Sequence, residues 1–105
     1  MRDELAIRLG GLAANLARVR SVSRNSMNRD VVFSLFEESK FFIEWTAAEA
    51  NLETAEELVD LQLQLAVWQR SLQSVWDDDC ARDEIGSASM HWSNRLIERS
   101  GLLER

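Results

Sequence analysis

The stretch LVDLQLQLAVWQRSLQSVW, residues 58–76, decides the fold. Its beginning alternates apolar and polar residues as a β-strand does, but the alternation stops at Leu65, whereas a helical spacing of three and four continues to the end. Leucine, glutamine and alanine also favour a helix over a strand. The stretch therefore predicts a helix whose core face carries six apolar residues: Leu58, Leu61, Leu65, Trp68, Leu72 and Val75.

The same helix has a second apolar face, nearly opposite the first at about 100° per residue. Its members are Val59, Leu63, Ala66 and Val67. A helix that is apolar on both sides is typically buried on both sides. We expect the first face to pack within its own chain and the second against another copy of the protein. The alternative is that the last helix of the same chain covers the second face.

Three more helices are predicted, and the 105-residue chain contains no proline to interrupt them. Thr54 followed by Glu57 has the spacing of a capping box, which sets the start of the helix just described near residue 55. Gly101 stands where a left-handed residue would end the last helix. The predicted helices cover about 3–21, 29–50, 55–76 and 80–100.

These helices predict an all-α fold, a four-helix bundle-like single domain over residues 1–105. It is built either within one chain or with helices packed or exchanged across a dimer. The first helix should contribute a narrow apolar seam, because its large apolar residues step strictly by four and three. That seam consists of Leu5, Leu9, Leu12, Leu16 and Val19.

Charge and cysteine content narrow the choice of partner and compartment. The net charge is −6, and residues 30–69 carry −8 of it while residues 1–29 carry +4. The acidic middle repels phosphates, so we expect no nucleic-acid partner, although the basic segment can contact an acidic surface. A membrane partner is not expected, since no apolar run approaches about 18 residues. One cysteine, Cys80, indicates a reducing cytoplasm.

Carboxylates suggest one enzymatic alternative, a metal-dependent nucleotide hydrolase. All-α pyrophosphohydrolases hold magnesium between two helices with paired acidic motifs, and the segment ELVD resembles one of them through Glu57 and Asp60. The preceding helix offers EESK, with Lys40 where a second carboxylate pair is needed. A solvated acidic face is therefore the preferred interpretation of these residues.

His91, the single histidine, suggests a third alternative. Histidine phosphotransfer domains are helical bundles of similar size, and helical geometry directs His91 away from the core face. The residues that follow, in HWSNRL, lack the lysine and glycine typical of such domains. A solvated surface histidine is the preferred interpretation.

These observations favour a non-enzymatic protein–protein interaction protein, an adaptor, regulator or assembly factor that works as a homodimer. Exposed apolar or acidic helix faces would bind the partner. We expect no catalytic residues, no cofactor and no metal site. The interaction candidates are Phe33, Phe41, Val59, Leu63, Val67 and Trp76.

Overall fold

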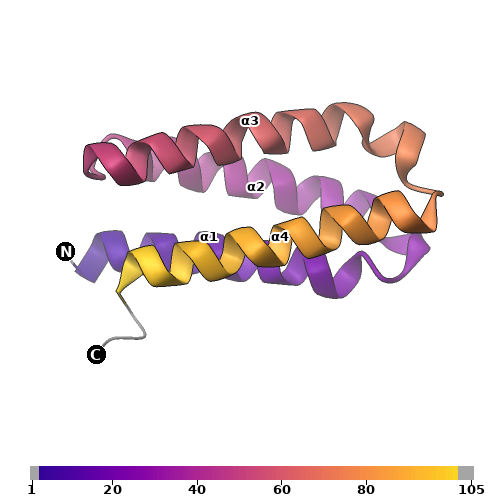
Figure 1. Cartoon of the computed structure of the whole chain (residues 1–105), viewed down its shortest axis with the longest axis horizontal. Helices are drawn as coiled ribbons and strands as arrows, with labels where there is room; N and C mark the ends of the chain where they lie inside the picture. Colours follow the sequence, from indigo (N-terminus) through magenta and orange to yellow (C-terminus); the bar gives the residue numbers. More distant parts are fainter. Residues whose placement is uncertain (1–2, 102–105) are drawn as a thin grey trace.

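The computed structural model describes residues 3–101 and confirms the all-α, four-helix bundle-like fold. The described chain contains no strand, and its helices run alternately up and down (Figure 1). A short 3₁₀ turn, η1, lies between the first two helices. The elements are α1 (Asp3–Val22), η1 (Ser26–Asn28), α2 (Arg29–Ala47), α3 (Leu52–Val75) and α4 (Asp79–Ser100).

Helix α1 holds the bundle together because it packs against both α2 and α4. Its contact with α4 is the most extensive in the protein, whereas α3 packs mainly on α2 and touches α4 much less. In Figure 1, α3 accordingly lies along one edge of the molecule. The helix that is covered on two sides within the chain is therefore α1 rather than α3.

The buried surface of α1 is wider than the narrow apolar seam predicted for this helix. Besides Leu9, Leu12 and Leu16, the small residues Ala6 and Ala13 are fully buried, whereas Leu5 is only partly buried. The polar Arg8 and Asn15 are nearly buried. The Arg8 guanidinium lies 4.2 Å from the centre of the Trp45 ring and donates to the backbone oxygen of Trp45. This contact secures the beginning of α1 to the end of α2.

Small side chains on α4 allow its close approach to α1. Gly86, Ser89 and Ser93 are buried, and the Ser93 hydroxyl donates a 2.7 Å hydrogen bond to the backbone oxygen of Ala13. A Cβ atom on Gly86 would lie only 2.5 Å from the Ser23 hydroxyl, just beyond α1. Larger residues at these positions would separate the two helices.

Trp76 is a core residue, so its place among the interaction candidates is wrong. Only 2% of it is exposed, and its indole Nε1 donates a 2.6 Å hydrogen bond to the backbone oxygen of Ser26. The physical reason is its position four residues after Leu72, which continues the core face of α3 by one more turn. Trp76 thereby ties the end of α3 to η1.

The start of α3 differs from the predicted capping box. Asn51 is the N-cap, and its side-chain oxygen accepts a 2.8 Å hydrogen bond from the backbone nitrogen of Thr54. Thr54 is thus a buried residue inside the helix, and α3 begins at Leu52 rather than near 55. Asparagine is at least as good an N-cap as threonine. Gly101, by contrast, adopts the predicted left-handed conformation, with φ of 73°.

The contact of α1 with α4 gives a first prediction. Ser93→Ala removes the buried hydrogen bond to α1 and should lower the free energy of unfolding by about 1 kcal/mol. Ser89→Ala is the matched control, because the buried Ser89 hydroxyl has no hydrogen-bond partner among the described residues. Urea unfolding should show Ser89→Ala to be neutral or slightly stabilising. Equal losses in both variants would contradict the role given to Ser93.

Candidate functional site

The outward face of α3 carries a line of exposed apolar side chains, which we call the α3 stripe: Val59, Leu63 and Val67. They are 50%, 62% and 58% exposed, respectively. A spacing of four residues places them above one another on one side of the helix. The alternative that α4 covers this face is wrong, because these side chains remain open in the complete bundle. These three interaction candidates therefore form one continuous surface.

The core fixes the direction in which the stripe points. On the opposite side of α3, Leu58, Leu61 and Leu65 are fully buried. Leu63 lies about 140° around the helix from Leu58, so burial of the one directs the other toward solvent. The Trp68 ring stacks on Phe36 of α2 at 5.5 Å between ring centres. This contact prevents α3 from rotating to bury the stripe.

Two aromatic candidates on α2 are also exposed. Phe33 is 42% exposed and Phe41 69%. Phe33 borders a shallow groove of about 300 Å³ between α2 and α3, which Arg70 and Gln73 line from the other side. Lys40 bridges the same two helices through a 3.0 Å hydrogen bond from its Nζ to Gln69 Oε1. Phe33 thus lies beside Arg70 of α3, three residues beyond the last member of the stripe.

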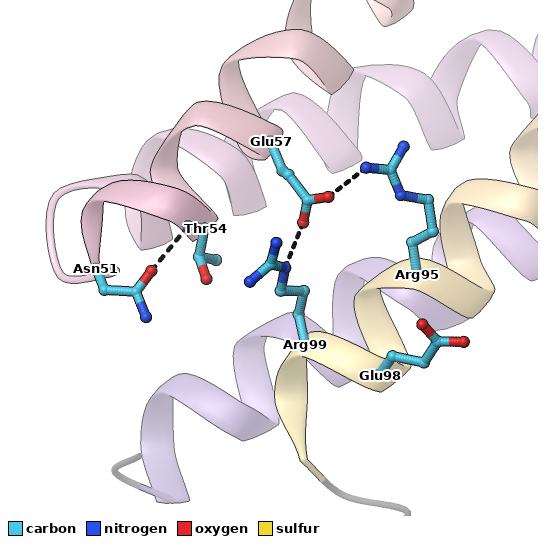
Figure 2. Close-up of a pocket in the computed structure, with 6 residues that line it drawn as sticks. All are labelled: Asn51, Thr54, Glu57, Arg95, Glu98 and Arg99. Carbon is cyan, nitrogen blue, oxygen red and sulfur yellow. Dashed lines mark hydrogen bonds and ion pairs between the residues drawn. The ribbon is translucent and has the colours of Figure 1, made fainter.

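A second, polar feature lies where the beginning of α3 meets the end of α4. Figure 2 shows Glu57 between two arginines of α4. Its carboxylate accepts hydrogen bonds from Arg95 and, at 2.6 Å, from Arg99 Nε. Arg99 also donates to Glu53 at 3.1 Å. A pocket of about 340 Å³ opens beside these residues, lined by Asn51, Thr54, Glu57, Arg95, Glu98 and Arg99.

The Glu57 carboxyl is held in its charged form. Burial opposes ionisation, but hydrogen bonds from Arg99 and Arg95 and their positive charges outweigh it, so the pKa of Glu57 lies below its ordinary value. The side chain is only 17% exposed. The arrangement works as an ionic clamp between α3 and α4, two helices that contact each other little. The sequence signal that could have revealed it is the pair of four-residue spacings, Glu53 to Glu57 and Arg95 to Arg99.

The clamp leaves little for metal chemistry. Both Glu57 oxygens are taken by arginines, and Asp60, its predicted companion, is exposed. Within residues 3–101 no group of three or more His, Cys, Asp or Glu side chains converges as metal ligands would. No observation in the described chain therefore favours the nucleotide hydrolase. His91 is exposed on α4, as its helical position predicted.

Comparisons with protein-family models, with curated proteins and with solved structures found no match to this chain. Within the described residues, none of the helices combines the length and apolar character needed to cross a membrane.

The ionic clamp gives a prediction with a defined pH dependence. Glu57→Gln should lower the stability by about 1 kcal/mol at neutral pH, since the arginines are partly exposed. The folded-state pKa is below the unfolded value of about 4.5. The stabilisation is therefore present above that value and is lost as pH falls through the folded pKa.

Thermal melts at several pH values test this prediction. The difference in Tm between wild type and Glu57→Gln should be largest near neutral pH and should shrink in acid. Asp60→Asn is the control, because Asp60 is exposed and forms no ion pair with a described residue. A difference in Tm that stays constant from about pH 7 to about pH 3 would contradict the clamp.

Proposed function

We propose that this chain is a non-enzymatic protein–protein interaction protein that acts as a homodimer, with the outward face of α3 as its binding surface. The observation that carries the proposal is the exposure of Val59, Leu63 and Val67 in one line. Contiguous apolar surface on a monomer is typical of an interaction site. The bundle is complete without this surface, so its apolar character serves no purpose inside the chain.

Energetics indicate what kind of complex the stripe supports. Each side chain already has about half its surface covered, so complete burial contributes about 1 kcal/mol per residue. For two copies this gives about 6 kcal/mol, at the lower end of the estimated 4–15 kcal/mol cost of association. Flanking contacts must therefore add to the stripe, and Phe33 and Phe41 on the neighbouring helix offer apolar surface for them. The expected dimer is weak and depends on concentration.

Acidic residues around the stripe supply selectivity. Residues 30–69, which include most of α2 and α3, carry a net charge of −8. Such a surface repels phosphates and selects partners whose charges complement it. The exposed free thiol of Cys80 supports the proposal that the protein works in a reducing cytoplasm.

The oligomeric state tests the proposal. Sedimentation velocity from about 5 to about 200 µM should show wild-type protein shifting from monomer to dimer. Leu63→Glu should remain monomeric, because association would bury an unpaired charge. Gln64→Glu is the matched control: it adds the same charge one residue further on, about 100° around the helix, and should still dimerise. A folded wild type that is monomeric throughout would overturn the proposal.

A second test separates a binding protein from an enzyme. Because both carboxylate oxygens of Glu57 are hydrogen-bonded to arginines, millimolar magnesium should leave the Tm unchanged. For the same reason, nucleoside triphosphates should not be hydrolysed. Both measurements use the wild-type chain, with Glu57→Gln as the comparison. Magnesium-dependent turnover that disappears in Glu57→Gln and in Asp60→Asn would replace the binding proposal with the hydrolase.

A further inference from the structure

The outward face of α3 is symmetric in its spacing about Leu63. Val59 and Val67 lie four residues to either side, Glu56 and Arg70 seven, and Leu52 and Ser74 eleven. At about 100° per residue these positions fall within an arc of about 80° that points away from the core. All seven residues are exposed. The face is thus continuous over six turns of α3. Its centre is apolar, with the negative Glu56 on one side and the positive Arg70 on the other.

The two charged residues have no ion-pair partner in the part of the chain that the structure describes. Most other arginines on the helices are used internally, as in the 2.8 Å contact of Arg20 with Asp83 and the clamp formed by Arg95 and Arg99. Glu56 and Arg70 are instead exposed on the same face as the α3 stripe. Their position and opposite sign suit an isologous interface, in which residue i contacts residue j of the partner and residue j contacts residue i.

We propose that two copies pair through antiparallel α3 helices, with the two-fold axis at Leu63 and with Glu56 opposite Arg70 of the partner subunit. This inference rests on the proposed homodimer and specifies its geometry. Leu63 meets Leu63 of the partner subunit at the axis. Val59 meets Val67 of the partner subunit on either side, so three apolar layers form the centre. An ion-pair layer closes each end of that centre and excludes water from it.

The charges select this arrangement over the parallel one. In a parallel pair with the same centre, Glu56 would meet Glu56 of the partner subunit, and the two Arg70 side chains would also meet. Like charges so placed repel each other, whereas the antiparallel pair has two attractive contacts. A shift in register would break both ion pairs and offset the apolar layers. Glu56 and Arg70 are therefore residues that determine orientation and register.

Exchanging the charges of Glu56 and Arg70 in the full-length chain tests the pairing. Glu56→Arg and Arg70→Glu should each weaken the dimer by about tenfold or more, because each creates two repulsive contacts. The double variant Glu56→Arg/Arg70→Glu should recover wild-type affinity to within about threefold. Mixing the two single variants should give a heterodimer tighter than either homodimer, which also shows that both variants are folded. Glu84→Arg, at an exposed position on α4, is the control and should not change the affinity.

Disulfide trapping tests the orientation independently, in a Cys80→Ser background. Leu63→Cys should cross-link with itself. Val59→Cys should not, because the two residues lie about 12 Å apart along the helix axis in the antiparallel pair. An equal mixture of Val59→Cys and Val67→Cys should cross-link. Efficient self-linking of Val59→Cys would overturn the inference in favour of a parallel pair.

The outcomes separate the two proposals. The antiparallel pairing is overturned, and the homodimer is left in place, if Leu63→Glu abolishes the dimer while Glu56→Arg and Arg70→Glu leave its affinity unchanged. A wild type that never dimerises overturns both. Loss in each single variant with recovery in the double variant supports both.

Discussion

Close contact between α1 and α4 is the constraint on which the rest of the structure depends. Helix α1 can lie between two neighbours only because α4 presents Gly86, Ser89 and Ser93 at buried positions. The hydrogen bond from Ser93 to the backbone of Ala13 then fixes the two helices at short distance. With α1 and α4 so closely paired, α3 is left to pack mainly on α2. The open face of α3 follows from this arrangement rather than from an incomplete core.

The two sides of α3 are held by different physical forces. Toward α2 the contact is apolar and aromatic, with Phe36 stacked on Trp68. Toward α4 the contact is small and includes the ionic clamp, with Glu57 between two arginines. The apolar contact sets the rotation of the helix and therefore the direction of the stripe. The outward face is thus a rigid part of a helix, which suits recognition that depends on register.

Sequence periodicity was enough to predict the all-α fold, the order of the helices and the core face of α3, because five of the six residues predicted for that face are buried and Val75 packs against the core. It failed where small or polar residues do the packing. The wide burial of α1 relies on Ala6, Ala13 and Arg8, which carry little signal in a pattern of large apolar residues. Which of two apolar faces stays open depends on the tertiary arrangement, so periodicity alone left open whether α4 covers Val59, Leu63 and Val67. Trp76 is buried because η1 packs against the end of α3, a tertiary contact that periodicity does not report.

The ionic clamp also determines which helix contact of the bundle opens first when salt is added. Added salt screens charges over a Debye length of about 8 Å at physiological ionic strength and weakens contacts between partly exposed groups, while it leaves apolar packing intact. Of the helix pairs in this bundle, the seam between α3 and α4 depends most on charge. We therefore expect local opening in saline solution to begin there, with α3 remaining on α2 and with α1 keeping its contacts to both α2 and α4.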